Sequence, residues 1–161
     1  MSLRIITTGG TFDKHYDPIA GALSFSRSHL DELCAQARLS APFSIEVLML
    51  IDSLDMDATH RAAVLAACRA APERQIVVIH GTDSMVETAA EIGAAALDKT
   101  VVVTGAMVPY EVTGSDAMFN LGFALGCAAH LGAGAWIAMN GVVHPWDRVR
   151  KNHELGVFEA L

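Results

Sequence analysis

The sequence has few charged side chains and no long basic segment. Lys, Arg, Asp and Glu make up 18% of its 161 residues, and the formal net charge at pH 7 is −7. The only short basic stretch contains Arg148, Arg150 and Lys151. Proteins that bind nucleic acid neutralise phosphates with clustered Lys and Arg side chains. We therefore predict that nucleic acid is not a partner of this protein.

Cysteine is scarce, and no residues have the spacing of a metal site. Cys34, Cys68 and Cys127 lie far apart in segments rich in Ala and Leu, which indicates buried thiols in a reducing compartment rather than disulfides or metal ligands. Six histidines also lack ligand spacing: His15, His29, His60, His130, His144 and His153. We therefore predict no metal ion and no other cofactor. His80 follows an apolar run and is predicted to be a hydrogen-bonded core residue.

We expect neither a leader segment nor a membrane span in this sequence. The amino terminus enters an apolar run directly, without a basic, apolar and small-residue leader, which predicts a cytoplasmic protein. Residues 121–139 carry no formal charge and are long enough to span a bilayer. Gly132-Ala133-Gly134 divides them into the end of a helix and the start of a strand. We therefore interpret them as two buried elements of a soluble fold, with no membrane partner.

What the sequence does contain is a repeated alternation of strands and helices. Apolar residues make up 52% of the chain, and its length suits one domain over 1–161. Strands are predicted at 3–8, 44–50, 75–80, 100–104 and 135–139, and helices at 28–38, 57–71, 84–97 and 116–131. Ser28, Asp57 and Ser115 are predicted to cap three of the helices. This alternation predicts an α/β fold with three layers, in which helices flank a mostly parallel sheet.

One predicted helix has a face of small residues. Gly122-Phe123-Ala124-Leu125-Gly126 would permit close packing against another helix or the sheet, or at a subunit interface. Together with the apolar composition, this predicts self-association.

Polar residues gather at the carboxyl ends of the predicted strands, where open α/β sheets bind ligands. Asp52, Ser53 and Ser84 are each interpreted first as turn or capping residues. Capping does not explain Thr11 and Thr82, because threonine is a poorer turn former and each follows a glycine. Either threonine could be a nucleophile or a ligand contact.

A hydroxyl nucleophile needs a base or a charged neighbour. Asp83 lies next to Thr82, and Lys151 could complete a proton relay with them. Backbone amides at 9–11 and 105–106 could bind an oxyanion. This set suits acyl transfer from an amide or ester to water.

Four segments together resemble the amino-terminal domain of bacterial-type asparaginases: ITTGGTFDKHY, DSLDM, HGTDSMVETA and KTVVVTGAMVPYEVTGSDAMFNLGFAL. The resemblance implies that Thr11 is the nucleophile and that Tyr16, on a flexible loop, activates it. It also implies a second triad of Thr82, Asp83 and Lys151. Substrate binding would involve Gly10, Ser53, Asp83 and Ala106, in a homo-oligomer such as a dimer or tetramer.

Two departures from the family pattern concern the grip on the substrate. Leu54 stands where the family usually has glutamine or serine. The sequence ends at Leu161, so we expect no carboxyl-terminal domain of the kind that lends an acidic residue to a neighbouring site in that family. Asp83 would then hold the substrate's α-amino group, helped by Glu154, Glu159 or a neighbouring chain. Each lost charged contact costs about 1.5–3 kcal/mol, which predicts weak substrate binding.

The resemblance implies an amidohydrolase that cleaves L-asparagine through a threonine acyl-enzyme. Alternatives are hydrolysis of glutamine, D-asparagine or an amide carried on a larger molecule, and a small-ligand-binding domain without catalysis. A phosphate or dinucleotide site is disfavoured, because the glycine-rich turn has neither G-x-G-x-x-G nor a P-loop lysine. The residues alone leave open which threonine attacks first.

Overall fold

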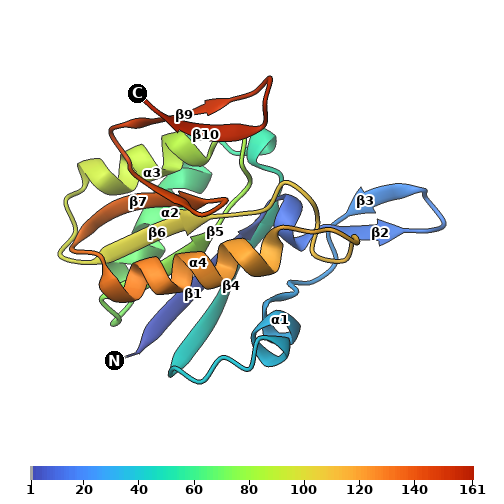
Figure 1. The fold of residues 1–161 in the computed structure, drawn as a ribbon, viewed down its shortest axis with the longest axis horizontal. Helices are drawn as coiled ribbons and strands as arrows, with labels where there is room; N and C mark the ends of the chain where they lie inside the picture. Colours follow the sequence, from blue (N-terminus) through green and yellow to red (C-terminus); the bar gives the residue numbers. More distant parts are fainter. Residues whose placement is uncertain (1) are drawn as a thin grey trace.

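A six-stranded sheet forms the centre of the molecule (Figure 1). The computed structural model describes residues 2–161. The strand order is β4-β1-β5-β6-β7-β8, and every pairing is parallel except the antiparallel pairing of β7 with β8. The strands are β1 (Leu3–Gly9), β4 (Phe43–Ile51), β5 (Gln75–Ile79), β6 (Thr100–Thr104), β7 (Gly134–Met139) and β8 (Val142–Pro145). The predicted mostly parallel sheet is confirmed.

Four helices cover the two faces of the sheet. They are α1 (Leu30–Gln36), α2 (Ala58–Ala70), α3 (Met85–Ala94) and α4 (Ala117–His130). Val64 of α2 and Ile92 of α3 share one apolar core with Val78 of β5. Leu33 of α1 and Leu121 of α4 share the other core. Neighbouring residues of a strand point to opposite faces, so the continuous apolar runs fill both cores and produce the predicted three layers.

Two hairpins and two short 3₁₀ helices complete the structure. The hairpins are β2 (His15–Asp17) with β3 (Ala22–Ser24), and β9 (Val149–Asn152) with β10 (Val157–Ala160). The 3₁₀ helices are η1 (Thr11–Asp13) and η2 (Ser53–Asp55). The β2–β3 hairpin projects from the body of the fold, whereas β9 and β10 lie beside α3 (Figure 1). The sequence did not predict the hairpins or β8, because they are short and their exposed residues carry little apolar periodicity.

The predicted helix starts are correct at one position and shifted at two. Asp57 caps α2 in a capping box: its side chain accepts the His60 amide at 3.0 Å. The caps of α1 and α4 are His29 and Asp116, each one residue after the predicted serine. Each serine hydroxyl instead accepts the amide two residues further on, in a local turn that competes with capping.

The cysteines and the long uncharged segment behave largely as predicted. Cys34, Cys68 and Cys127 are free thiols, and the first two are buried. Burial raises the pKa of Cys68 to about 12.

The segment 121–139 is divided between α4 and β7, as predicted. Within residues 2–161, none of the helices combines the length and apolarity needed to cross a bilayer.

The small-residue face of α4 is not used for packing within the described chain. A methyl group added to Gly122 or Gly126 would meet no heavy atom within 4 Å. The prediction of close packing inside the chain is therefore wrong at these two positions, and they face outward. Phe119 on the same helix is 60% exposed and stacks on Phe123, with ring centroids 6.5 Å apart.

Candidate active site

The carboxyl ends of four adjacent parallel strands bring the predicted site residues to one edge of the sheet. β4, β1, β5 and β6 are neighbours in that order. Thr11 follows β1, Ser53 follows β4, Thr82 follows β5 and Ala106 follows β6. Parallel strands end at the same edge, so residues that are distant in the sequence become neighbours here.

Glycines allow the turns at this edge to touch. Gly10 has φ +66°, and a Cβ added there would lie 2.5 Å from the Cα of Gly81. A Cβ added at Gly81 would collide with the Ser53 side chain. Only glycine fits these positions without moving backbone, so the turns that carry Thr11, Ser53 and Thr82 lie in direct contact.

Lys151 links the hydroxyl and carboxylate that follow β5. Its Nζ donates to Thr82 Oγ1 at 2.9 Å and to Asp83 Oδ1 at 2.6 Å. The Lys151 side chain is only 6% exposed, and that of Asp83 is 34% exposed. A lysine removed from water in this way is stabilised by its carboxylate partner. The structure therefore joins the three residues that the sequence proposed as a relay.

Ser53 stands beside this group. Its Oγ accepts the Asp83 amide at 3.2 Å, and its carbonyl accepts the Ser84 hydroxyl at 2.7 Å. The Ser53 hydroxyl proton is thus left to donate to another group. Ser84 makes no side-chain cap for α3, so the capping interpretation is wrong for Ser53 and Ser84. It is confirmed for Asp52, which caps η2 by accepting the Leu54 amide at 3.1 Å.

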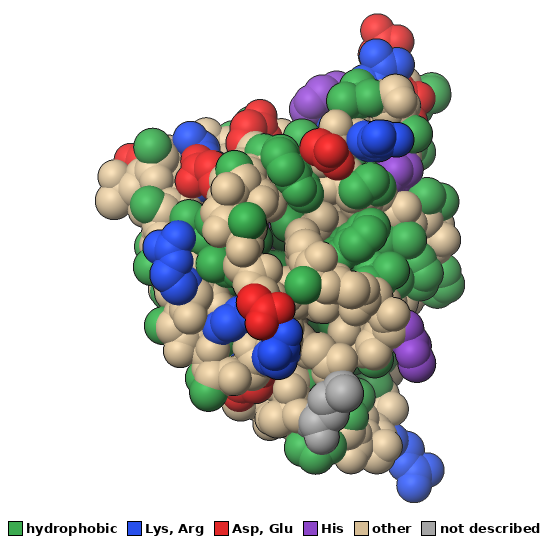
Figure 2. Space-filling view, turned by 90° about the vertical axis from the view of Figure 1, so that its left-hand side faces the viewer, with side chains coloured by type: hydrophobic (Ala, Val, Ile, Leu, Met, Phe, Trp, Pro, Cys, Tyr) green, Lys and Arg blue, Asp and Glu red, His purple; other side chains and the backbone are tan. Residues whose placement is uncertain are grey.

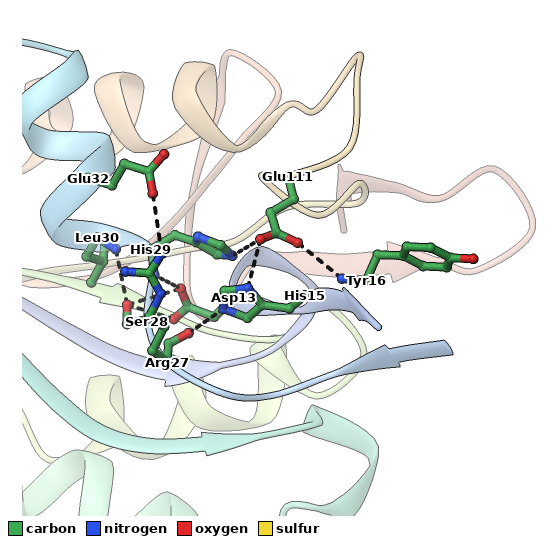
Figure 3. A network of polar contacts seen from close by, with 9 residues as sticks. All are labelled: Asp13, His15, Tyr16, Arg27, Ser28, His29, Leu30, Glu32 and Glu111. Atoms are coloured by element: carbon green, nitrogen blue, oxygen red, sulfur yellow. Dashed lines mark hydrogen bonds and ion pairs between the residues drawn. The ribbon is translucent and has the colours of Figure 1, made fainter. Parts of the chain in front are cut away.

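The turn that carries Thr11 is held by a buried aspartate. Asp13 is fully buried and accepts hydrogen bonds from the Thr7 hydroxyl at 2.6 Å, the Ser28 hydroxyl at 3.0 Å and the His29 amide at 2.8 Å. Figure 3 shows Asp13 among its partners at the start of α1. Sequence reasoning missed this residue, because a single aspartate after a turn is ordinary.

Lys14 connects the same turn to η2. Its Nζ pairs with Asp52 Oδ2. The Lys14 hydrogen bond lowers the pKa of Asp52 below its ordinary value, and the Leu54 amide adds to this effect. The pair fastens the segment after Thr11 to the segment that carries Ser53.

Two backbone donors proposed for an oxyanion are engaged within the fold. The Gly10 amide donates to Ile51 O at 3.0 Å, and the Gly9 amide donates to Thr7 Oγ1 at 3.1 Å. The expectation that these two amides bind an oxyanion is therefore wrong. The amide of Thr11 remains as the candidate donor of this turn.

Tyr16 lies on the projecting β2–β3 hairpin. Its side chain is 57% exposed and points away from the neighbouring polar network (Figure 3). Its amide donates to Glu111 Oε2 at 3.1 Å. Within residues 2–161, neither the Tyr16 hydroxyl nor the Thr11 hydroxyl takes part in a hydrogen bond. The structure thus does not join these two hydroxyls in the way that it joins Thr82 to Lys151.

The turn after β6 is held by Asn120 of α4. Its Nδ2 donates to Gly105 O at 2.9 Å, and its Oδ1 accepts the Asn140 amide at 2.9 Å. Ala106 is fully buried beside this turn. Asn120 was not predicted from the sequence, because a polar residue inside an apolar helix is informative only when its partners are known.

His80 is a core residue, as predicted. It is fully buried, with Nδ1 2.7 Å from Gly81 O and Nε2 2.8 Å from Thr88 Oγ1. A carbonyl can only accept, so Nδ1 carries the proton and Nε2 accepts from Thr88. Burial lowers the pKa of His80, which favours the neutral ring. His80 thereby stabilises the Gly81 turn through its hydrogen bond to the Gly81 carbonyl.

One group in the described part of the chain could hold a metal ion. His15, His29 and Glu111 place their ligand atoms within 4.8 Å of one another. None of them is among the predicted catalytic residues, and their separation along the sequence hid the cluster.

Over the face shown in Figure 2, acidic and basic side chains are interspersed with hydrophobic ones.

Comparison with known proteins gives consistent matches. Residues 2–159 match the family described as Asparaginase, N-terminal. A subunit of the glutamyl-tRNA(Gln) amidotransferase of Pyrococcus furiosus is 29% identical over 166 aligned positions, which cover 94% of this chain and 38% of that protein. The corresponding subunit of the Pyrococcus abyssi enzyme is 30% identical over 163 positions, covering 92% and 37%.

Solved structures show the same fold. L-asparaginase I from Vibrio cholerae matches with a TM-score of 0.87 and 26% identity, over 99% of this chain and 51% of that one. The thermostable L-asparaginase from Thermococcus kodakarensis matches with 0.88 and 26%, over 100% and 51%. A probable cytoplasmic L-asparaginase from Campylobacter jejuni matches with 0.85 and 29%, over 98% and 52%. The chain spans about half the length of these structures and less than two fifths of the amidotransferase subunits.

Proposed function

The chain belongs to the asparaginase family, and on this premise we propose that it is an amidohydrolase that cleaves the side-chain amide of L-asparagine to aspartate and ammonia. The observation that carries the proposal is the buried Lys151 ammonium, which bridges the Thr82 hydroxyl and the Asp83 carboxylate. It lies at the ligand-binding edge of a parallel sheet, beside Ser53 and the turn of Thr11. Similarity to L-asparaginases and amidotransferase subunits supports amide chemistry.

In the proposed reaction, the substrate lies over the strand ends. The Ser53 hydroxyl donates to the α-carboxylate, because its oxygen already accepts the Asp83 amide and its proton is available. Asp83 Oδ1 is engaged by Lys151, so Oδ2 accepts from the substrate's α-ammonium group. Gly10 provides the close approach of backbone, and Ala106 contacts the substrate amide through its carbonyl.

The chemistry then proceeds in two steps. Thr11 Oγ attacks the side-chain amide carbon, and the hydroxyl proton passes by way of Tyr16 to the leaving nitrogen. The carbon–nitrogen bond breaks, ammonia leaves and an aspartyl ester forms on Thr11. Water then attacks the ester: Thr82 takes a proton from the water, and Lys151 takes the Thr82 proton as it gives one of its own to Asp83 Oδ1. The same relay then runs in reverse to protonate the departing Thr11 oxygen, so aspartate leaves and Thr11 regains its hydroxyl. Tyr16 must move toward Thr11 for the first step, which requires closure of its hairpin.

An ammonia-release assay with L-asparagine, L-glutamine and D-asparagine tests this proposal. We expect the fastest release from L-asparagine, with weak binding and saturation only above about 0.1 mM. A slowed variant, trapped with substrate and mapped by mass spectrometry, should carry an aspartyl ester on Thr11. Absence of ammonia from every amide would instead indicate a small-ligand-binding domain without catalysis.

A related amidase is the second candidate. The two relatives from Pyrococcus are subunits of a glutamyl-tRNA(Gln) amidotransferase, which favours glutamine or an amide on a larger molecule as the alternative substrate. Faster ammonia release from glutamine than from asparagine would support this candidate. We expect the protein to be cytoplasmic in either case.

We also propose that the protein is a homo-oligomer, a dimer or a tetramer. The outward-facing Gly122 and Gly126 and the exposed Phe119 form an apolar surface on α4. Light scattering after size-exclusion chromatography should give the mass of more than one chain. Phe119→Lys should lower that mass if this surface is the interface.

A further inference from the structure

Three side chains that can bind metals meet where the β2–β3 hairpin joins the rest of the molecule. His15 begins β2, His29 directly precedes α1, and Glu111 belongs to the segment between β6 and α4. His15 Nδ1 lies 2.8 Å from Glu111 Oε1, and His29 Nε2 lies 3.8 Å from the same oxygen. Figure 3 shows both imidazoles and the carboxylate turned toward one another.

His29 is buried without a hydrogen-bond partner. Its side chain is 1% exposed, and neither ring nitrogen forms a hydrogen bond. A buried polar group without a partner is energetically unfavourable, because it has lost its hydrogen bonds to water. The Nε2 atom nevertheless faces the Glu111 carboxylate at a distance too long for a direct hydrogen bond. A metal ion, which is larger than a proton, would fit between His29 Nε2 and Glu111 Oε1.

The hydrogen bonds of His15 indicate a positive charge at the same place. His15 Nε2 lies 2.9 Å from the Arg27 carbonyl, which can only accept, so Nε2 carries a proton. In a neutral ring, Nδ1 then presents a lone pair to Glu111 Oε1. Two acceptors 2.8 Å apart repel each other unless both bind the same cation or Nδ1 is also protonated.

A proton and a metal ion differ in what they satisfy. A second proton on His15 would complete its bond to Glu111 but would leave His29 Nε2 without a partner. A divalent cation would bind all three groups. The bond from His15 Nε2 to the Arg27 carbonyl is also the contact that orients metal-binding histidines in proteins.

We propose that His15 Nδ1, His29 Nε2 and Glu111 Oε1 bind one divalent transition-metal ion. Two imidazoles and one carboxylate, with water as the fourth ligand, are a donor set that suits Zn²⁺. A cavity of about 660 Å³, lined by His29, Glu111, Tyr16 and Tyr110 among others, gives a hydrated ion access to the cluster. This site is distinct from the Thr82–Asp83–Lys151 group and does not depend on the proposed hydrolysis.

The ion would fasten the hairpin that carries Tyr16. Glu111 Oε1 would bind the ion, and Oε2 accepts the Tyr16 amide at 3.1 Å. The ion would thus tie both ends of this contact, β2 and the segment before α4, to the start of α1. Its role is to hold the base of the hairpin, and it takes no part in the chemical steps.

Zinc titration of the full chain tests the proposal. The protein is stripped with a chelator, and zinc chloride is added in an isothermal titration calorimeter. We expect one ion per chain in the wild type, and at least about 100-fold weaker binding in Glu111→Gln and His29→Gln, since loss of a ligand should cost more than loss of a supporting contact. Glu32→Gln is the matched control, because Glu32 is an acidic neighbour outside the cluster, paired with Arg27, and it should bind like the wild type.

Two further readouts locate the ion. Cobalt(II) should give the visible absorption of a tetrahedral site in the wild type and in Glu32→Gln, but not in Glu111→Gln. Zinc should also slow hydrogen exchange of residues 15–24 in the wild type and in Glu32→Gln, but not in Glu111→Gln. Glu111→Gln carries the test if His29→Gln fails to fold, because Glu111 is on an exposed segment and glutamine can still accept the Tyr16 amide.

Either of two results would overturn the proposal. Equal zinc binding by the wild type and Glu111→Gln would assign the ion to other histidines. No binding at millimolar zinc would show that the cluster is a protonated His15 paired with Glu111.

Discussion

The two threonines of the candidate site follow equivalent turns and yet have different surroundings. Each comes after a glycine at the end of a buried parallel strand. Thr82 is 5% exposed, and its hydroxyl accepts from a buried lysine. Thr11 is half-buried, and its predicted activator Tyr16 points into solvent on a projecting hairpin. One half of the site is preorganised by buried charge, whereas the other half would need a movement of Tyr16 for the proposed reaction.

This difference assigns different tasks to the two halves. Interactions that are already in place can stabilise charge without reorganisation during the reaction. A tyrosine on a hairpin that closes can admit substrate and then exclude water. We therefore expect substitutions in the Lys151 half to act on chemistry directly. Substitutions around Tyr16 should reveal the cost of closing the hairpin.

Replacing Thr11, the proposed nucleophile, should have the largest effect. Thr11→Val removes the hydroxyl but keeps the shape, and we expect kcat to fall by at least about 10⁴-fold. Thr11→Ser, which keeps a hydroxyl, is the control and should retain measurable turnover. Ammonia release and circular dichroism measure activity and fold. Near-wild-type turnover in Thr11→Val, with none in Thr82→Val, would exchange the roles of the two threonines.

Removing the buried ammonium should come next. Lys151→Met leaves Thr82 and Asp83 without their bridge, and we expect kcat to fall by about 10³-fold, within the range of acid–base catalysis. Arg150→Met alters the neighbouring exposed residue of β9, which pairs with Glu159, and should keep the wild-type rate. Unchanged kcat in a folded Lys151→Met protein would contradict the assignment of Lys151 as the proton relay.

Tyr16→Phe should have a smaller effect of about 100-fold on kcat. The ring and its position on the hairpin are retained, so only the hydroxyl contribution to the first step is lost. KM should change little, because the hydroxyl is not assigned to substrate binding. If KM rises while kcat stays constant, Tyr16 binds substrate instead of activating Thr11.

The smallest effect concerns the ion pair between Lys14 and Asp52, which joins the segment after Thr11 to the segment that carries Ser53. The Lys14 hydrogen bond lowers the pKa of Asp52 in the folded protein, so the pair adds stability above the unfolded pKa of about 3.9. This stability is lost as the pH falls through the lowered folded pKa. We expect Asp52→Asn to reduce the free energy of unfolding at pH 7 by at most about 1 kcal/mol, because both side chains are partly exposed.

Urea unfolding at pH 7 and at about pH 3 measures this difference, which should shrink at the lower pH. Asp98→Asn, in the exposed pair with Arg74, is the matched control and should change stability little at either pH. A difference between the wild type and Asp52→Asn that grows as the pH falls would show that Lys14 does not stabilise the charged carboxylate.

Many of the strands and helices of the fold could be predicted from local sequence patterns. The sequences of β5 and β6, QIVVI and TVVVT, are continuous runs rich in β-branched residues. Parallel strands between two helical layers have such sequences because both of their faces are buried. Asp57 could be predicted as the start of α2 because its side chain caps the helix by accepting the His60 amide. The hairpin strands carry no comparable signal: β3 is exposed at all three residues, so no apolar pattern separates it from a loop.

The polar pairings were harder to predict. Asp13 with Ser28, Lys14 with Asp52, and His15 and His29 with Glu111 each join residues whose types are common in loops. Nothing in their spacing distinguishes such pairs from exposed residues. The same limit shifted the caps of α1 and α4, where the predicted serines accept amides in a local turn at the start of each helix.

The sequence by itself determined the parallel sheet and the presence of Thr11 and Thr82 at strand ends, because buried strands and glycine turns have strong local signatures. Only the tertiary structure decided that Lys151 reaches Thr82 across the fold, that the Gly9 and Gly10 amides are already engaged, and that Tyr16 points outward. These outcomes depend on strand order and on the paths of short polar connections. Local propensity does not encode them, because the energy of such contacts arises only when distant segments meet.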